Sequence, residues 1–425
     1  MMLVSWTYWT GMPFWFRKPP EAADVESLVL RAHDLRQIRA HWWTSTAHST
    51  PKVGVVVMHP RVDFSHHYAI PRLVGAGLGV LAANTRHAGN DTMAEHEEMV
   101  LDVDACVRYL RERRGVDKVV LLGNCGGASL AAYYQAQAAL PAGERVRRSP
   151  GGTRTQFESA ALPPADAMVY VAPHRGQGKI LLESIDPSVV DEDDPLAADP
   201  ELDMYDARNG FREPPAWSEY DEAFLARYRV AQRARVARID AAARGLLERV
   251  AEANAAAAAP GFADRPDGER REVMRRRACE PVMVVHRTNA NPAYVDPLID
   301  PSDRDYGSLL SERPDLMNYA ALGLARTCTP RAWLSTWSGL SSNADLVANV
   351  ARIAAPTLLV HAGRDREIFP ADIAAIGGAI AAADRRVVTI EGARHYFEPE
   401  PGDRQAPHVE ALMDVVVPWI EERCA

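Results

Sequence analysis

The fold of this chain is indicated most clearly by one segment, Lys118-Val-Val-Leu-Leu-Gly-Asn-Cys-Gly-Gly-Ala-Ser-Leu130. Its first half is a short apolar run that predicts a buried strand, and a helix of small residues is expected from Ala128 onward. A side chain on such a sharp strand-to-helix turn needs glycine neighbours, because helix and strand come close there. Cys125 occupies that position, at a helix N-terminus that favours a thiolate. The pattern indicates a cysteine nucleophile, with the backbone N–H of Gly126 directed at a developing oxyanion.

Apolar runs of strand length recur on both sides of this turn and alternate with helical patterns. One of these patterns is an amphipathic segment from Val100 to Leu110 that closes at Gly115. The expected strands are Ser27–Arg31, Arg39–Trp43, Gly54–His59, Gly79–Ala83, Lys118–Gly123, Ala167–Val171, Thr357–His361 and Arg386–Ile390. We therefore predict an α/β fold, a mostly parallel eight-stranded sheet with helices on both faces.

The last two predicted strands lead into the partners that a cysteine nucleophile requires. Asp365 follows the first of them and His395 follows the second. Catalytic groups gather at the carboxyl edge of a parallel sheet, so both side chains are expected near Cys125. The chain order nucleophile, acid, histidine completes a predicted triad of Cys125, Asp365 and His395, with Glu367 as a competing candidate for the acid.

The composition excludes several classes of protein. With 425 residues, of which 47% are hydrophobic and 25% charged, the chain suits one core domain with a substantial extra module. A formal charge of -9 without a basic face argues against a nucleic acid partner. Five cysteines without CxxC spacing argue against a disulfide framework and indicate a reducing cytoplasm. No stretch approaches the ~18 consecutive apolar residues of a membrane span.

No cofactor and no metal are expected. A GxxxxGK[ST] loop is absent, and the glycine cluster at residues 75–79 leads into a strand where a dinucleotide loop would follow one. His66 and His67 are adjacent, so they point to different faces of a helix, and His96-Glu97-Glu98 lacks the second histidine of HExxH.

The pattern changes over residues 174–345, which we predict to be a largely helical cap inserted into the core. An acidic, proline-rich stretch opens it, and a long helix is expected from about Glu222 to Ala259. The candidates for lining an apolar pocket in this cap are Phe211, Tyr319, Trp333 and Trp337. At the other end of the chain, residues 1–24 form an aromatic-rich arm that would pack on the chain's own core or on the second subunit of a homodimer.

These features resemble the α/β-hydrolase superfamily over residues 25–173 and 346–425. A cysteine at the elbow is similar to dienelactone hydrolases and to some acyl-transferring relatives, including polyester synthases, although the large cap departs from the compact dienelactone hydrolases. The resemblance implies a second oxyanion donor in the loop after the strand Gly54–His59. Pro60 has no N–H to give, so Arg61 or Val62 is expected to supply it.

The same loop leads to candidates for substrate binding. The Arg61 side chain would contact a substrate carboxylate, or else it faces solvent or a loop acid. His66 and Tyr68 follow on the expected first helix, near the pocket mouth.

The triad predicts a hydrolase that cleaves a carboxylic ester, lactone or thioester of a small-molecule acyl substrate through a thioester acyl-enzyme. A thioester also passes its acyl group readily to other nucleophiles, so an acyltransferase or cyclase is the first alternative. A non-catalytic binding protein on a hydrolase fold is the second, because a fold alone does not establish function.

Overall fold

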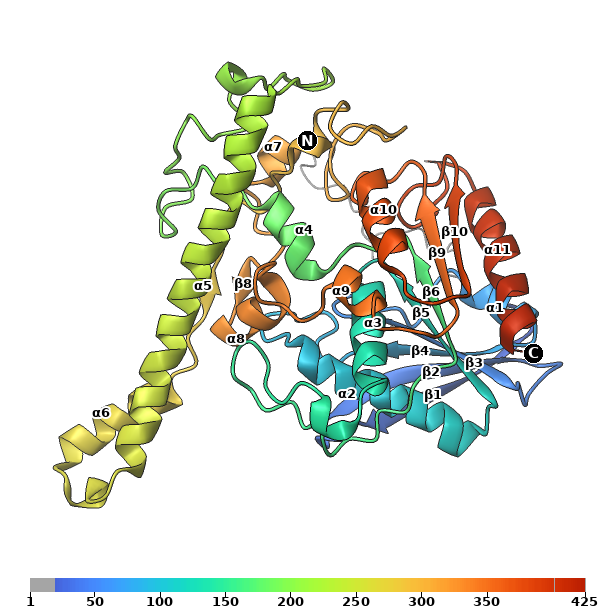
Figure 1. Ribbon diagram of the computed structural model, residues 1–425, viewed down its shortest axis with the longest axis horizontal. Coiled ribbons are helices and arrows are strands. Elements are labelled where there is room, and N and C mark those ends of the chain that lie inside the picture. The colour runs from blue at the N-terminus through green and yellow to red at the C-terminus, as the bar shows by residue number, and fades with distance from the viewer. Residues whose placement is uncertain (1–19, 401, 425) are drawn as a thin grey trace.

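An eight-stranded sheet organises the molecule (Figure 1). The computed structural model describes residues 20–400 and 402–424, so the predicted aromatic arm lies mostly outside the described residues. The strands of the sheet are β1 Ala23–Arg31, β2 Gln37–Ser45, β3 Val53–His59, β4 Gly79–Asn84, β5 Lys118–Asn124, β6 Ala167–Val171, β9 Thr357–Ala362 and β10 Arg385–Ile390.

The order of the strands is β1-β2-β4-β3-β5-β6-β9-β10. β2 runs antiparallel to both β1 and β4, and all the other neighbours are parallel. Every residue of β3 is buried, which explains its continuous apolar run, because helices cover both faces of a parallel sheet. The predicted α/β fold, a mostly parallel eight-stranded sheet with helices on both faces, is confirmed.

Helices connect most of these strands. Their bounds are α1 Ile70–Gly75, α2 His96–Arg108, α3 Gly126–Ala138, α4 Gln177–Ser184, α5 Glu222–Ala258, α6 Asp267–Ala278, α7 Pro314–Met317, α8 Pro330–Ala332, α9 Leu346–Val350, α10 Pro370–Ala379 and α11 Pro407–Cys424. The amphipathic segment predicted before Gly115 is α2, which continues as a π-helical turn, Tyr109–Arg114. Gly115 ends it with a φ of 64°, a conformation that favours glycine.

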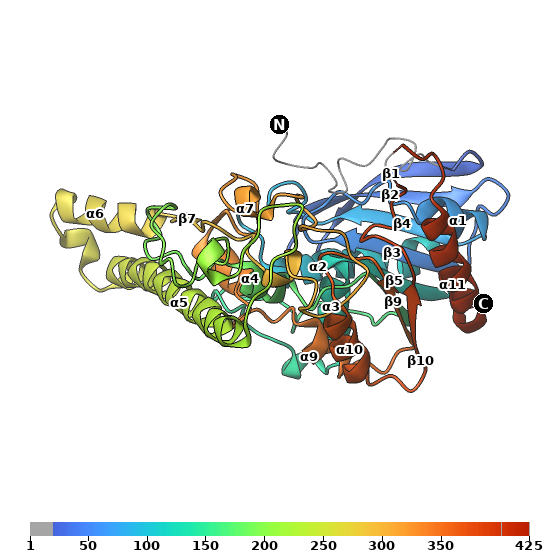
Figure 2. The same cartoon turned by 90° about the horizontal axis from the view of Figure 1, so that it is seen from above.

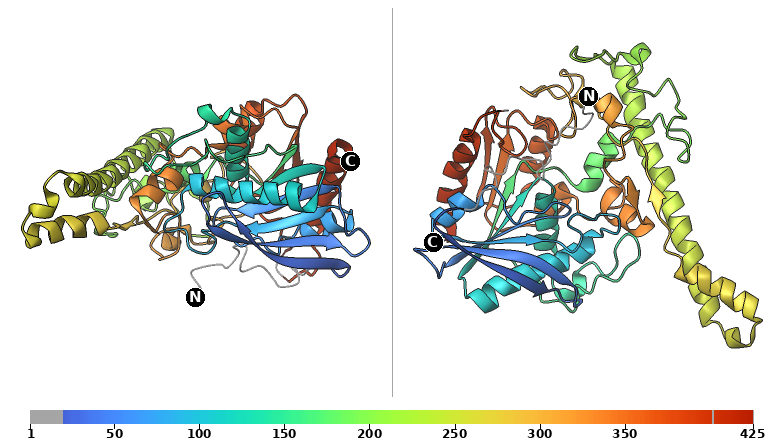
Figure 3. Two further views of the ribbon diagram at one scale, coloured as in Figure 1. Left: turned by 90° about the horizontal axis from the view of Figure 1, so that it is seen from below. Right: turned by 180° about the vertical axis from the view of Figure 1, so that it is seen from behind.

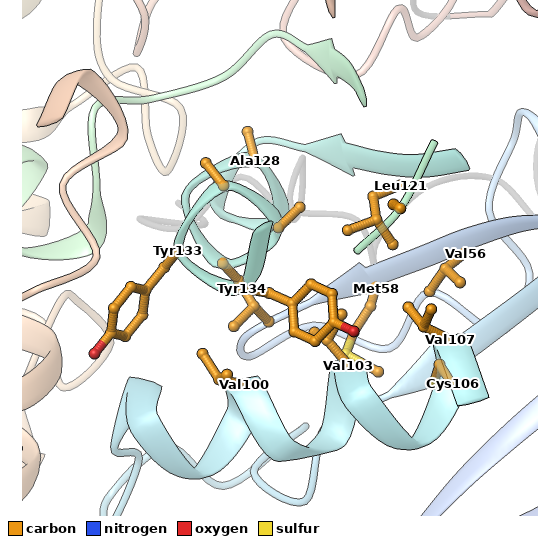
Figure 4. Close-up of a cluster of buried hydrophobic side chains, with 14 of the residues drawn as sticks. Val56, Met58, Val100, Val103, Cys106, Val107, Leu121, Ala128, Tyr133 and Tyr134 are labelled. Carbon is orange, nitrogen blue, oxygen red and sulfur yellow. The ribbon is translucent and has the colours of Figure 1, made fainter. Parts of the chain in front are cut away.

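Two hydrophobic clusters sandwich the sheet. Helices α1 and α11 cover one face, and α2, α3, α9 and α10 cover the other (Figure 2). On the second face, Val56 and Met58 of β3 and Leu121 of β5 pack against α2 and α3, where Tyr133 and Tyr134 lie (Figure 4). This packing fixes α3, and with it the turn that carries Cys125, against the centre of the sheet.

Between β6 and β9 the chain leaves the sheet for an insert, defined here as residues 172–356. The insert has its own buried cluster, in which Trp333 and Trp337 pack with Val236 and Ile239 of α5. It also holds a two-stranded sheet of β7 Met283–Val284 and β8 Thr327–Cys328. The far end of α5, together with α6, projects away from the rest of the molecule (Figure 3). Among the residues described, no helix is long and apolar enough to cross a membrane.

Candidate active site

Cys125 lies between the end of β5 and the start of α3, in a strained backbone conformation. Its φ of 54° and ψ of −123° are rare for a residue other than glycine. The backbone N–H of Cys125 donates to the carbonyl of Val171 on β6 at 3.0 Å, and its own carbonyl accepts from the N–H of Ala128 at 3.2 Å. These hydrogen bonds to the sheet and to the helix keep the backbone of Cys125 in its strained conformation, which places the thiol at the turn.

Two glycines make this turn possible. A Cβ on Gly123 would lie 2.4 Å from the Cα of Ala128, and a Cβ on Gly127 would lie 2.3 Å from the carbonyl oxygen of Met58 on β3. Both contacts are with backbone atoms that cannot move aside cheaply. The glycines therefore allow α3 to approach β5 and β3 closely enough for Cys125 to sit at the sheet edge.

Asp365 and His395 form a buried pair next to this turn. His395 Nδ1 lies 2.7 Å from Asp365 Oδ2, and the two side chains are almost fully excluded from solvent. The other carboxylate oxygen, Asp365 Oδ1, accepts the backbone N–H groups of Glu367 at 2.8 Å and of Ile368 at 3.1 Å. Asp365 thus fixes the imidazole through Nδ1 and leaves Nε2 for another partner.

Cys125 and His395 influence each other's pKa. Burial alone would raise the pKa of Cys125, but the charge of His395 and hydrogen bonds from His174, His395 and His59 lower it well below its usual value. Burial opposes a charged imidazole at His395, but Asp365 and Cys125 raise its pKa well above the usual value. Both shifts favour a thiolate on Cys125 and an imidazolium on His395.

Glu367, the competing candidate for the acid, contacts a different partner. Its two carboxylate oxygens accept the hydroxyl of Tyr294 at 3.2 and 3.1 Å. Burial is the largest cause that raises the pKa of Glu367, to about 8. Near neutral pH this side chain is thus a neutral carboxylic acid that faces the site.

Two histidines and a glutamine near Cys125 were not among the residues predicted from the sequence. His59 is the last residue of β3, His174 follows β6, and Gln177 begins α4. All three are buried. The signal that could have found the histidines is the rule already used for Asp365 and His395, because both lie at or just beyond the carboxyl ends of central strands.

The backbone N–H groups of Arg61 and Val62, the predicted oxyanion donors, bind a side chain of the protein itself. Both N–H groups donate to Nδ1 of His59, each at 3.0 Å. The Arg61 side chain bonds Asp91, a loop acid, through Nε, and its guanidinium lies 4.7 Å from the ring centre of Trp337. The role of these two N–H groups in an oxyanion hole stays a prediction, and the geometry directs them to His59.

A small cavity opens beside the thiol. Its volume is about 40 Å³, room for a few water molecules. Its walls come from the sheet loops and from the insert, and its lining residues are His59, Arg61, Cys125, His174, Gln177, Ile180, Thr288, Asn289, Tyr294, Leu309, Leu310, Leu324 and Glu367. The lining combines polar side chains with the aliphatic Ile180, Leu309, Leu310 and Leu324, so the cavity suits an acyl group with a polar substituent.

The other predicted substrate contacts lie outside this lining. His66 and Tyr68 precede α1, which begins only at Ile70 because Pro71 is suited to the first turn of a helix. The Tyr68 hydroxyl donates to Asn124 Oδ1 at 3.1 Å, behind the turn, and the His66 ring packs edge-on against Trp43. These contacts position the chain next to Cys125.

The aromatic candidates of the insert mostly belong to its interior. Trp333 is fully buried and donates its indole N–H to Asp240 Oδ1 at 2.7 Å, and Trp337 is fully buried beneath the guanidinium of Arg61. Phe211 packs edge-on against Tyr205, and Tyr319 lies under Arg287. Their contact with a substrate stays a prediction.

No family model matches the chain, and no curated protein matches it in sequence. Several solved structures are similar in shape. DcsB, in complex with its substrate analogue, gives a TM-score of 0.48 at 12% identity, covering 94% of this chain and 100% of that one. Est1E from Butyrivibrio proteoclasticus gives 0.45 at 11%, covering 93% and 98%. The Pyrococcus furiosus esterase Pf2001 gives 0.43 at 11%, covering 95% and 91%.

Proposed function

We propose that this protein is a cysteine-dependent hydrolase that cleaves a carboxylic ester, lactone or thioester. The observation that carries the proposal is the thiol of Cys125, held on a strained turn and paired in charge with a histidine that Asp365 fixes at 2.7 Å. Nucleophile, base and orienting acid are the parts that covalent acyl transfer requires.

In the first half of the cycle, the thiolate of Cys125 attacks the carbonyl carbon of the substrate. A C–S bond forms and the carbonyl electron pair moves to oxygen, where the N–H of Gly126 helps to hold the charge. The intermediate then collapses, the bond to the leaving group breaks, and the imidazolium of His395 gives its proton to the leaving atom. A thioester on Cys125 and a neutral His395 result.

In the second half, neutral His395 takes a proton from water as the water oxygen attacks the thioester carbon. The new intermediate expels the thiolate of Cys125 and releases the carboxylic acid. The thiolate and imidazolium are restored, so the cycle needs no cofactor. Since the reaction depends on a free thiol, it suits a reducing compartment such as the cytoplasm, and all five cysteines of the chain are free.

We assign the role of a cap to residues 174–345. They supply most of one wall of the cavity, including Asn289, Tyr294 and Leu309. The cavity beside the thiol is narrow, so we expect part of this segment to move as substrate enters. The enclosure also shields the acyl-enzyme from bulk water, which favours acyl transfer or cyclisation as the alternative reaction.

The test compares the wild type with Cys125→Ala on a panel of aryl esters, lactones and acyl thioesters. We expect turnover of at least one class by the wild type and none above background by Cys125→Ala, with unchanged circular dichroism. Product analysis with added alcohols and amines separates hydrolysis from acyl transfer. Undiminished turnover in Cys125→Ala would refute the nucleophile, and binding of an acyl compound without turnover by the wild type would favour the non-catalytic binding protein.

A further inference from the structure

Three side-chain nitrogens converge on one point beside Gly126. A Cβ built on this glycine would lie 3.0 Å from Nε2 of His59, 3.0 Å from Nε2 of His174 and 2.5 Å from Nε2 of Gln177. The three side chains come from separate parts of the chain, and each is at most 3% exposed. Gly126 is also the residue after the nucleophile, whose backbone N–H is the expected oxyanion donor.

The backbone around both histidines sets which ring nitrogen carries the proton. Nδ1 of His59 accepts the N–H groups of Arg61 and Val62, each at 3.0 Å, and Nδ1 of His174 accepts the N–H of Gly176 at 3.0 Å. A ring nitrogen that accepts an N–H carries no hydrogen in the neutral imidazole, so the proton sits on Nε2. Both histidines therefore present an N–H at the point beside Gly126.

The Nε2–H group of His59 can donate to a substrate oxygen. Its side chain is fully buried, and its Nε2 has no nitrogen or oxygen partner. Burial is the largest influence on the pKa of His59 and lowers it, so the ring is neutral near pH 7. An anionic oxygen that arrives at this point would therefore meet a neutral N–H donor.

The same proton positions make a metal site unsuitable here. A metal would need the Nε2 lone pairs, and Nδ1 would then carry a hydrogen pointing at backbone N–H groups. In the part of the chain that the structure describes, no group of three His, Cys, Asp or Glu side chains is arranged to hold a metal ion. The convergent nitrogens are donors, and their fitting ligand is an anionic oxygen.

We propose that His59, His174 and Gln177 form a side-chain oxyanion hole, together with the backbone N–H of Gly126. It takes the place of the backbone donors of Arg61 and Val62, which are bound to His59. This inference rests on the proposed acyl transfer at Cys125. Before attack the two imidazoles hydrogen-bond the thiolate. As the C–S bond forms, the negative charge moves to the carbonyl oxygen, and the same N–H groups then donate to that oxygen.

The test separates two reactions of one thiol. Acylation of Cys125 by an aryl ester creates an oxyanion, whereas alkylation by iodoacetamide does not. The variants are His59→Leu and His174→Leu, which remove one donor each, and His59→Gln, whose amide nitrogen can replace Nε2. His96→Leu is the matched control, since His96 is also a fully buried histidine but lies outside the cavity lining. The rates of acylation and of alkylation are both measured in single turnover, at a pH above the pKa of the Cys125 thiol.

We expect each leucine variant to acylate about 10²- to 10³-fold more slowly, the effect of losing one oxyanion donor. The limiting alkylation rate should change by less than about tenfold, His59→Gln should recover part of the acylation rate, and His96→Leu should match the wild type. Equal losses in both reactions, or unchanged acylation in both leucine variants, would overturn the proposal. If Cys125 were not the nucleophile, the wild type itself would form no acyl-enzyme, which is a distinguishable failure.

Discussion

Glu367 allows a quantitative prediction from a single titration. Its pKa is raised from 4.5 to about 8, chiefly by burial. Between these pH values the folded protein holds a proton that the unfolded chain releases, so the free energy of unfolding falls as the pH rises. At about 1.4 kcal/mol per pH unit, the difference of about 3.5 units corresponds to a fall of about 5 kcal/mol.

Glu367→Gln removes this titration while keeping the size of the side chain and an acceptor for Tyr294. We expect the free energy of unfolding of the variant, minus that of the wild type, to increase by about 5 kcal/mol from pH 4.5 to pH 8.5. The difference should be flat above and below this window. Equilibrium urea denaturation at pH intervals, followed by tryptophan fluorescence, measures it.

Tyr294→Phe is the matched variant, because the hydroxyl of Tyr294 donates to the carboxyl and lowers its pKa. Its removal should raise the pKa of Glu367 further and extend the fall in stability to higher pH. Parallel stability curves for the wild type and Glu367→Gln across the whole pH range would refute the assignment of a neutral, buried carboxylic acid.

Three further variants test the turn and the triad. Asp365→Asn should lower turnover by about 10³- to 10⁴-fold, because the pair with His395 at 2.7 Å no longer fixes the imidazole, as steady-state kinetics would show. Gly127→Ala places a Cβ 2.3 Å from a backbone oxygen and should cost about 1–3 kcal/mol of stability in denaturation, whereas Gly378→Ala, with open space around it, should not. Cys125→Ser should lose at least about 10²-fold in turnover, because serine does not form the resting ion pair; retained turnover would point to a site built for serine.

The strands were predictable from the sequence because each central strand is buried on both faces and reads as an apolar run. All eight predicted strands occur. β1 begins earlier than expected because its first part, with Asp24 and Glu26, is exposed and polar and breaks the apolar run, and β2 is longer than expected at both ends. The start of α1 was misplaced, since His66 and Tyr68 precede the helix that Pro71 helps to begin.

The site was only partly predictable, for a physical reason. Cys125, Asp365 and His395 follow strands in a recognisable order, and the structure brings Asp365 and His395 into contact. His59 and His174 carry no such pattern, because their function depends on backbone donors that fold back onto Nδ1. Hydrophobicity also cannot tell an aromatic residue in the interior of the insert, such as Trp333, from one that lines a pocket.

The most direct test of the central claim is the intact mass of the protein after brief exposure to an aryl ester or an acyl thioester, followed by peptide mapping. The account predicts an acyl adduct on the peptide that contains Cys125, formed in a burst and lost in Cys125→Ala. An acyl adduct on another residue, or turnover by the wild type without any adduct and unchanged in Cys125→Ala, would contradict it.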